Sequence, residues 1–232
     1  MLEFIEQELA RHVVIPVIAI ENTQAAIALT DALLEGGLPV VEITFRTSVA
    51  AEVIQTICRD RPNMVVGAGT ILSVENLELA KRCGAKFGVA PGTNPQVVKR
   101  AAELRLPFVP GVATPSEIEH ALALGCRCLK FFPAEAAGGA AMLAALSAPY
   151  QHTGVKFIPT GGVNPKNLAD YLSLDTVIAV GGTWLAKKED IAAGQWPQIR
   201  TRCREAAELV HKIRATNPVR TAAPTPGRDR GT

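Results

Sequence analysis

The sequence has no surplus of charge of either sign. Lys and Arg total 24 and Asp and Glu total 22 in a chain of 232 residues. Three of the arginines and one aspartate lie in residues 217–232, so residues 1–216 carry 21 charges of each sign. A neutral body offers no electrostatic footprint for a polyanion. Binding to nucleic acid or to an anionic membrane surface is therefore not expected.

Long apolar runs are also missing. None approaches the ~18 residues that a membrane-spanning helix requires. The first nine residues, MLEFIEQEL, are acidic and amphipathic, unlike a secretory signal peptide, and predict an N-terminal helix. The cysteine count is odd in a chain large enough to fold without disulfides. We therefore expect a cytoplasmic protein with free thiols at Cys58, Cys83, Cys126, Cys128 and Cys203.

Metal-binding patterns are scarce. Cys126 and Cys128 are too close in sequence for an ordinary pair of zinc ligands. None of the four histidines falls at the C-terminal end of a predicted strand. A histidine-ligated Lewis acid is therefore not expected, and we predict a reaction that uses neither a metal nor another cofactor.

Eight short apolar runs, by contrast, alternate with longer helical stretches along the whole chain. Successive runs begin 19 to 29 residues apart, which fits one strand, one helix and two short loops. This spacing predicts a (β/α)₈ TIM barrel in a single domain over residues 1–216, with an open doubly wound sheet as the alternative. Polar residues that look out of place occur at the C-terminal ends of many predicted strands. An open sheet would concentrate them at one point, so their spread favours the barrel. The runs begin near Val13, Pro39, Met64, Lys86, Pro107, Cys126, Val155 and Leu174.

Helix boundaries are marked by capping residues and glycines. Asn94-Pro95, Thr114-Pro115 and Asn164-Pro165 each place a capping side chain before a proline at the first helical position. Helices are expected to end near Gly36, Gly84 and Gly125. Residues 217–232 are rich in Pro, Thr, Gly and Arg, which predicts a disordered tail.

Lys130 is the first candidate functional residue. It lies within the apolar strand CLKFF, where alternation places Leu129 and Phe131 on one face and Lys130 on the other. If the bulky pair packs on the outer helices, the lysine points into the barrel. Burial there disfavours the charged ammonium, so part of the side chain is expected as free amine. A neutral amine is the nucleophile that forms a Schiff base with a carbonyl substrate, whereas a lysine that reaches solvent is the simpler alternative.

Glu42 and Arg46 repeat this anomaly on the second predicted strand. Alternation in VVEITFR places Glu42, Thr44 and Arg46 on the inward face. A buried carboxylate is costly unless a partner or a reaction uses it. An imine-forming lysine needs a nearby acid/base, which Glu42 could supply. Arg46 is expected at the rim, where it could bind a substrate carboxylate.

Two glycine loops follow the last two predicted strands. Thr160-Gly161-Gly162 comes after the seventh strand and Gly181-Gly182-Thr183 after the eighth. In this fold the loops after strands 7 and 8 often form a phosphate site from backbone N–H groups and a helix N-terminus. Ordinary tight turns are the alternative reading.

Together these residues resemble a known family. The strings PVIAI, VEITFRT, VGAGT, APG, FVPGVATPSE, LKFFPAEAAGG, PTGG and VGGTWL occur in this order. They are similar to the 2-keto-3-deoxy-6-phosphogluconate (KDPG) and 4-hydroxy-2-oxoglutarate (KHG) aldolases from about Val13 to Arg214. The resemblance implies a homotrimeric class I aldolase of (β/α)₈ fold that acts on a small keto-acid phosphate.

The resemblance also implies a role for each site residue. Lys130 would form the Schiff base and Glu42 would act as general acid/base through water. Arg46 and Thr70 would bind the pyruvate carboxylate. Thr183 departs from the family pattern, in which a serine is expected. The remaining residues would shape the keto-acid pocket (Pro91, Phe132 and Thr160) or receive the phosphate (Gly161, Gly162, Gly181 and Thr183).

The substrate is left open at this level. The expected reaction is reversible cleavage of KDPG to pyruvate and glyceraldehyde 3-phosphate. Within the family, KHG or the galactonate epimer of KDPG are alternatives. A phosphate-binding isomerase or epimerase could use the glycine loops without an imine, but it leaves a buried Lys130 unexplained. The non-enzymatic alternative is a trimeric scaffold or a metabolite-binding barrel.

Overall fold

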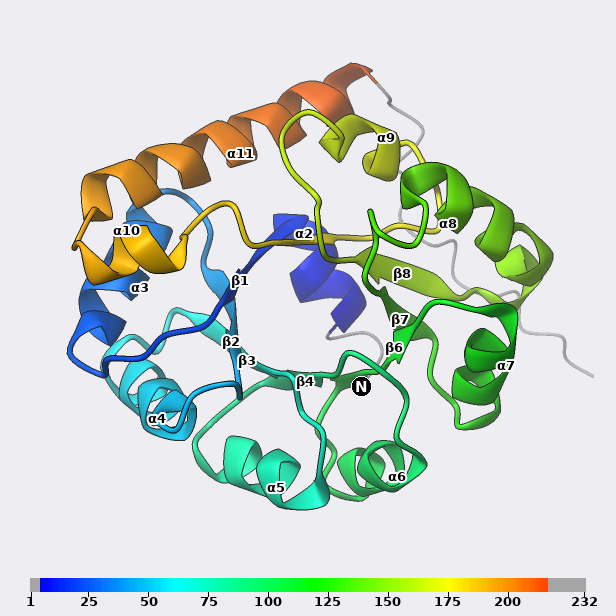
Figure 1. The fold of residues 1–232 in the computed structure, drawn as a ribbon, viewed down its shortest axis with the longest axis horizontal. Helices are drawn as coiled ribbons and strands as arrows, with labels where there is room; N and C mark the ends of the chain where they lie inside the picture. Colours follow the sequence, from blue (N-terminus) through cyan, green and yellow to red (C-terminus); the bar gives the residue numbers. More distant parts are fainter. Residues whose placement is uncertain (1–4, 217–232) are drawn as a thin grey trace, which may run out of the picture.

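The computed structural model describes residues 5–216 and shows an α/β architecture in which helices surround parallel strands (Figure 1). The predicted tail at 217–232 lies outside the described residues. The strands are β1 (Val14–Ile18), β2 (Val40–Thr44), β3 (Val65–Gly69), β4 (Phe87–Val89), β5 (Phe108–Val109), β6 (Gly111–Val112), β7 (Cys128–Phe131), β8 (Lys156–Pro159) and β9 (Val180–Gly182).

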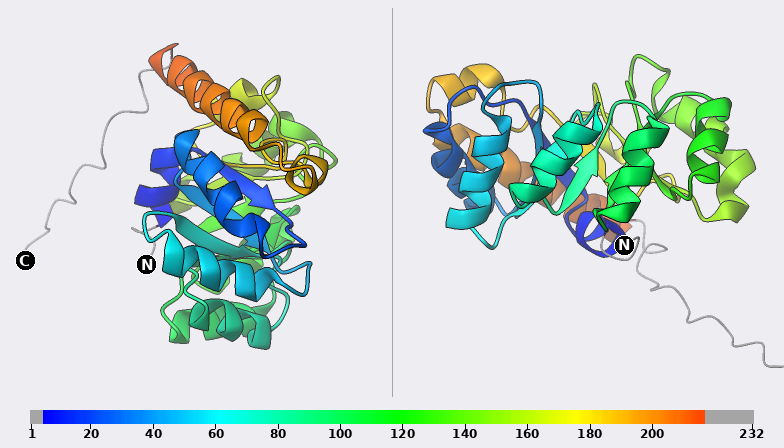
Figure 2. Two further views of the ribbon diagram at one scale, coloured as in Figure 1. Left: turned by 90° about the vertical axis from the view of Figure 1, so that its left-hand side faces the viewer. Right: turned by 90° about the horizontal axis from the view of Figure 1, so that it is seen from below.

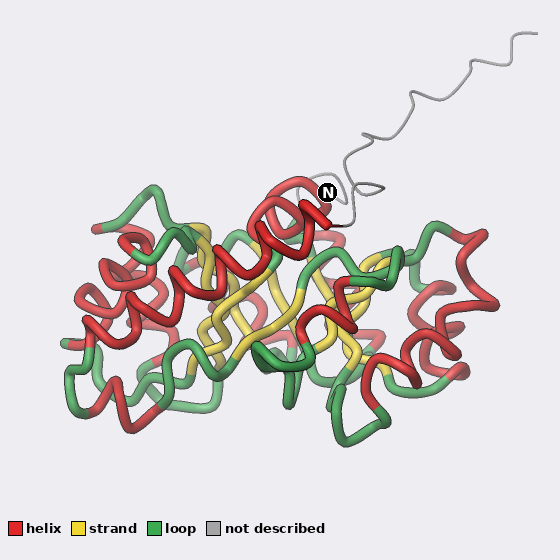
Figure 3. Tube along the Cα trace, turned by 90° about the horizontal axis from the view of Figure 1, so that it is seen from above, coloured by secondary structure: helices red, strands yellow, loops and turns green. Residues whose placement is uncertain are grey.

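The helices follow the strands in regular alternation. The side views show the helices that come after the first strand on the outside of the strands (Figures 2 and 3), whereas the N-terminal helical segment lies inside the ring of helices (Figure 1). No helix between residues 5 and 216 combines the length and apolar character needed to cross a bilayer. The helices are η1 (Ile5–Leu9), α2 (Ala10–His12), α3 (Ala25–Glu35), α4 (Ala50–Asp60), α5 (Val74–Arg82), α6 (Pro95–Glu103), α7 (Pro115–Ala123), α8 (Gly139–Ser147), η2 (Ala148–Thr153), α9 (Leu168–Leu172), α10 (Lys188–Ala192) and α11 (Trp196–Thr216).

The strands form two parallel sheets instead of one continuous sheet. Their orders are β5-β4-β3-β2-β1-β9 and β6-β7-β8. The fifth predicted strand is divided at Pro110, which has no N–H to donate to a ladder. This segment still bonds to both sheets. Gly88 N donates to Pro107 O, and Lys130 N donates to Pro110 O, each at 2.8 Å.

The eighth predicted strand begins later than its apolar run suggests. The run starts near Leu174, but β9 begins at Val180. Isolated bridges, and not a continuous ladder, connect residues 176–181 to the neighbouring strand β8 and to Thr160. Phe157 N of β8 donates to Thr176 O at 2.7 Å, and Thr160 forms a parallel bridge with Gly181. Hydrogen bonds therefore connect β8 to the β9 segment, although the two are not paired as strands.

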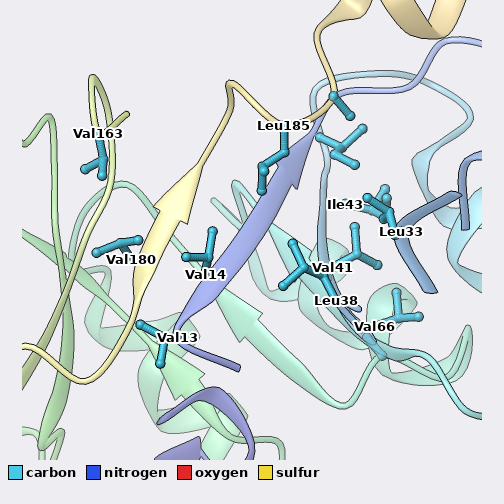
Figure 4. Close-up of a cluster of buried hydrophobic side chains, with 14 of the residues drawn as sticks. Val13, Val14, Leu33, Leu38, Val41, Ile43, Val66, Val163, Val180 and Leu185 are labelled. Carbon is cyan, nitrogen blue, oxygen red and sulfur yellow. The ribbon is translucent and has the colours of Figure 1, made fainter. Parts of the chain in front are cut away.

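Two buried clusters lie on opposite faces of the strands. Between strands and helices, the larger cluster includes Val41 and Ile43 of β2 and Leu129 and Phe131 of β7 (Figure 4 draws part of it). The alternation predicted for both strands is confirmed. The smaller cluster lies on the inward face of the strands and includes Leu9, Ile15, Val40, Phe87, Val89, Val109, Cys128, Ile158 and Ala179.

Most predicted helix boundaries are confirmed. Asn94 and Thr114 cap α6 and α7, and Thr114 forms the expected capping box with Glu117. At Asn164-Pro165 the expected start is wrong, because α9 begins at Leu168. The Asn164 side chain caps a short turn instead, accepting from Lys166 N at 3.0 Å. The predicted N-terminal helix is short and irregular where it is described, with η1 followed directly by α2, and residues 1–4 lie outside the described part.

Candidate functional site

A buried lysine–glutamate pair occupies the interior of the strand assembly. Lys130 of β7 and Glu42 of β2 are 5% and 4% exposed. Lys130 Nζ lies 3.3 Å from Glu42 Oε1. The pair joins residues 88 positions apart, as predicted from the inward faces of the two strands. Because removing both charges from water is expensive, such a pair contributes little to stability, and this makes it a candidate functional site.

Gly69 at the end of β3 makes room for this pair. A Cβ at Gly69 would lie 2.1 Å from Glu42 Oε1 and 2.7 Å from its Cδ. Any larger residue would therefore displace the carboxylate. The second glycine of the VGAGT segment is thus required for steric reasons, which the sequence alone did not reveal.

Phe132 connects the amine to the first glycine loop. Its ring centroid is 5.4 Å from Lys130 Nζ, within the range of a cation–π contact. On the other side, a Cβ at Gly161 would lie 3.3 Å from the Phe132 ring. Phe132 therefore contacts both Lys130 and Gly161.

Arg46 lies two residues beyond β2 and is exposed, as expected for a rim position. Its Nε donates to Thr44 Oγ1 at 3.3 Å, and Thr44 Oγ1 in turn donates to Ile18 O at 3.1 Å. Thr44 is only 2% exposed. The buried hydroxyl thus anchors the guanidinium to the end of β1, a role that strand periodicity could not indicate.

Thr70 and Pro91 follow the C-terminal ends of β3 and β4. Thr70 has a φ of +56°, a left-handed conformation that is strained for a β-branched residue. Such strain often accompanies functional sites. Pro91 lies beside the β5–β6 segment, because a Cβ at Gly111 would be 2.1 Å from Pro91 O. Neither residue has a described hydrogen bond to Lys130 or Glu42.

The loop after β8 presents N–H groups while its carbonyls are occupied. Gly161 and Gly162 have φ values of +98° and +86°. Gly161 O accepts from Glu135 N at 2.9 Å, and Gly162 O accepts from the side-chain amides of Asn164 and Asn167 at 2.9 and 3.2 Å. Within residues 5–216, the N–H groups of Gly161 and Gly162 have no acceptor. Successive free N–H groups of this kind form an anion-binding concavity.

The prediction that Gly181 and Gly182 form a loop after the last strand is wrong, because both lie within β9, where Gly181 bridges to Thr160. A Cβ at Gly181 would be 2.3 Å from Thr160 Oγ1, so glycine permits this close approach. Thr160 is 3% exposed, whereas Thr183, directly after β9, is exposed. The start of the first glycine loop and the end of β9 are therefore adjacent.

Most predicted residues thus follow the C-terminal ends of strands, whereas Glu42, Lys130 and Gly181 lie within β2, β7 and β9. Described contacts unite Lys130 with Glu42 and Phe132, and Thr160 with Gly181. Residues that the sequence analysis did not single out as site residues hold them in place: Thr44, Gly69, Asn164 and Asn167. Among residues 5–216, no group of three His, Cys, Asp or Glu side chains is placed to hold a metal ion.

Comparison with known proteins gives consistent results. A family model described as KDPG and KHG aldolase matches residues 5–202. A 2-dehydro-3-deoxy-phosphogluconate aldolase of Treponema pallidum is 43% identical over 204 residues, which cover 88% of this chain and 96% of that protein.

Solved structures agree with these sequence matches. A KDPG aldolase from Legionella pneumophila, with pyruvate captured as a covalent carbinolamine intermediate, has a TM-score of 0.83 and 38% identity, covering 86% of this chain and 96% of its own. The corresponding aldolase of Zymomonas mobilis, solved with 3-phosphoglycerate, has a TM-score of 0.82 and 35% identity, covering 90% of this chain and 97% of its own.

Proposed function

The chain belongs to the KDPG and KHG aldolase family, and from this premise we propose that it is a class I aldolase that reversibly cleaves KDPG to pyruvate and glyceraldehyde 3-phosphate. One observation carries the proposal: a buried lysine amine lies 3.3 Å from a buried carboxylate. The pair provides a nucleophile and a proton-transfer group in one enclosed site.

Lys130 is proposed as the nucleophile. Its amine attacks the C2 ketone of the substrate to give a carbinolamine, and loss of water gives a protonated imine. The imine accepts the electron pair of the C3–C4 bond when that bond breaks. The product is an enamine of pyruvate, which is protonated at C3 and then hydrolysed to release pyruvate and free Lys130.

Glu42 is proposed as the general acid/base. Its carboxylate, directly or through water, removes the C4 hydroxyl proton as the C3–C4 bond breaks, which releases the aldehyde product. The same group moves protons during carbinolamine dehydration. Gly69 supports this role because its missing side chain leaves space for the Glu42 carboxylate.

The two ends of the substrate are proposed to bind at different strand ends. Arg46 and Thr70 bind the carboxylate, and Pro91, Phe132 and Thr160 shape the pocket around the keto acid. The free N–H groups of Gly161 and Gly162 support phosphate binding at the other end. Gly181 and Thr183 would complete the phosphate site. The threonine methyl at position 183 adds bulk where the family is expected to have serine.

KHG is a second candidate substrate, because the matching family model includes KHG aldolases. It has a second carboxylate and no phosphate. The two free N–H groups of Gly161 and Gly162 support a phosphorylated substrate. The galactonate epimer differs from KDPG only in stereochemistry at C4.

For the architecture, we propose that residues 1–216 form one closed (β/α)₈ barrel. The bonds of residues 107–112 to both sheets and the bridges from β8 to residues 176–181 support closure. The inward-facing cluster around Leu9 and Ile15 supports it as well. A homotrimer is also proposed, from the resemblance to the family alone, and the free cysteines support a cytoplasmic location.

Turnover of purified KDPG tests the function. Pyruvate release is followed with a coupled lactate dehydrogenase assay, and kcat/KM is compared for KDPG, its galactonate epimer and KHG. KDPG is expected to have the highest value. Absence of pyruvate release from all three substrates would refute the aldolase, and a higher value for KHG would reassign its substrate.

A further inference from the structure

Glu135 lies behind the first glycine loop, in the segment between β7 and α8. Its backbone N–H donates to Gly161 O at 2.9 Å. Its side-chain stem packs over Gly162, because a Cβ at Gly162 would lie 2.5 Å from Glu135 Cβ and Cγ. Main chain and side chain of one residue therefore contact both glycines whose N–H groups are free.

The carboxylate of Glu135 is fixed at its far end. Glu135 Oε1 accepts a hydrogen bond of 2.5 Å from Tyr171 Oη. Tyr171 is fully buried and lies on α9, the helix that follows the glycine loop. Burial, together with the hydrogen bond to Glu135, raises the pKa of Tyr171, so its hydroxyl remains a donor at neutral pH.

Main-chain bonds of the preceding residue, Ala134, hold the same region together. Ala134 N donates to Thr160 O at 2.8 Å, and Gly139 N donates to Ala134 O at 2.9 Å. The strand that carries Lys130, the glycine loop and α9 are therefore held together at Glu135. A hydrogen bond to an ionised group is among the stronger ones in proteins, so Tyr171 restricts where the Glu135 stem lies.

We infer that Glu135, held by Tyr171, is a positioning residue that fixes the Gly161–Gly162 loop for an anion and thereby sets the preference for phosphorylated over unphosphorylated keto acids. This inference rests on the proposed aldolase function. Glu135 acts through the loop and takes no part in imine chemistry. Its loss is therefore expected to change binding at the phosphate end and to leave bond cleavage intact.

The test measures KM and kcat for KDPG and for KHG with Tyr171→Phe, Glu135→Ala and Glu135→Gln. Tyr171→Phe keeps the buried ring and removes only the hydroxyl, so the core remains packed. It is expected to raise KM for KDPG about tenfold, to change kcat less than about twofold, and to leave KHG kinetics unchanged. Glu135→Ala is expected to act in the same direction, whereas Glu135→Gln, which can still accept from Tyr171, retains most of the preference.

Tyr150→Phe is the matched control. Tyr150 Oη of η2 donates to Glu119 Oε1 at 3.1 Å, so this variant also removes a tyrosine–glutamate hydrogen bond. Tyr150 lies in the segment that precedes β8, at the opposite end of that strand from the glycine loop. The ratio of kcat/KM for KDPG to that for KHG is expected to stay at the wild-type value.

Binding of inorganic phosphate, measured by calorimetry, separates this inference from the proposed reaction. Phosphate is expected to bind wild-type protein more tightly than Tyr171→Phe, whether or not KDPG is cleaved. Equal phosphate affinity in both proteins, or an equal loss of activity on both substrates, would overturn the role of Glu135. If KDPG is not cleaved but Tyr171→Phe still weakens phosphate binding, the aldolase proposal is refuted and the role of Glu135 is supported.

Discussion

The two faces of strand β7 carry opposite kinds of buried side chain. Leu129 faces the helices and is fully buried in the large apolar cluster. Its neighbour Lys130 faces the interior, is 5% exposed, and meets Glu42. Strand β2 repeats this division, with Ile43 outward and Glu42 inward. In the proposed reaction, one strand therefore contributes to stability on one face and to chemistry on the other.

This comparison shows why strand register matters. Side chains alternate between the faces, so a slip of one residue would exchange the apolar and charged sets. Burial of the outer set stabilises the fold by roughly 25 cal/mol for each Å² of apolar surface. The inner pair gains little net stability, because desolvation offsets its Coulomb attraction. The outer layer thus stabilises a site that would not stabilise itself.

Lys130→Met tests the inner face of β7 and has the largest expected effect on activity. Loss of the nucleophile is expected to reduce kcat/KM for KDPG by on the order of 10⁴-fold or more, because no imine can form. The coupled pyruvate assay measures this loss, and circular dichroism checks the fold. Activity near the wild-type level would place the chemistry elsewhere.

Leu129→Ala tests the outer face at the adjacent position. Removing a buried leucine side chain is expected to lower the free energy of unfolding by about 2–5 kcal/mol. At a temperature where the variant is folded, kcat should stay within about twofold of wild type. Urea denaturation gives the stability and the pyruvate assay gives kcat. A large loss of activity in folded protein would show that the two faces are not separate.

Thr44→Val tests the anchoring of Arg46 on the inner face of β2. Loss of the hydroxyl removes a bond worth about 1 kcal/mol, so KM for the keto acid is expected to rise roughly fivefold with little change in kcat. Thr44→Ser keeps the hydroxyl and should restore KM. In an Arg46→Met background, Thr44→Val should have no further effect on KM. Additive effects would show that Thr44 acts independently of Arg46.

Cysteine labelling tests how tightly the outer layer is packed around Cys203. Burial raises the pKa of Cys203 to about 12, so almost no thiolate exists at pH 8. Cys83 is partly exposed, and burial raises its pKa as well. Iodoacetamide at pH 8 is expected to label Cys83 well before Cys203, at least about tenfold faster. Peptide mass spectrometry follows both sites, and similar rates would mean that the layer around α11 opens readily.

Much of this fold could be predicted from local patterns. The apolar runs gave most strand positions because parallel strands buried on both faces are rich in Val and Ile. Pro110 divides one strand because it lacks an N–H, an effect visible only once both neighbouring strands are known. The late starts of α9 and β9 depend on side-chain and bridge bonds at Asn164 and Thr176, which the run lengths do not encode.

The site was predictable where a single residue contradicted its surroundings. Lys130 and Glu42 are charged residues in apolar strands, so alternation alone indicated their inward positions. Glu135 and Tyr171 are 36 residues apart and neither is unusual in its local sequence. Gly69 has an ordinary φ and its role appears only beside Glu42. Such contacts depend on the three-dimensional arrangement and not on periodicity.

Borohydride trapping tests the central claim, covalent capture of pyruvate by Lys130, most directly. Wild-type protein is incubated with pyruvate, reduced and digested, with Lys130→Met treated in parallel. The account predicts one reduced pyruvate adduct on the peptide that contains Lys130 and no adduct on the variant. Unmodified wild-type protein, or an adduct on another lysine, would contradict it.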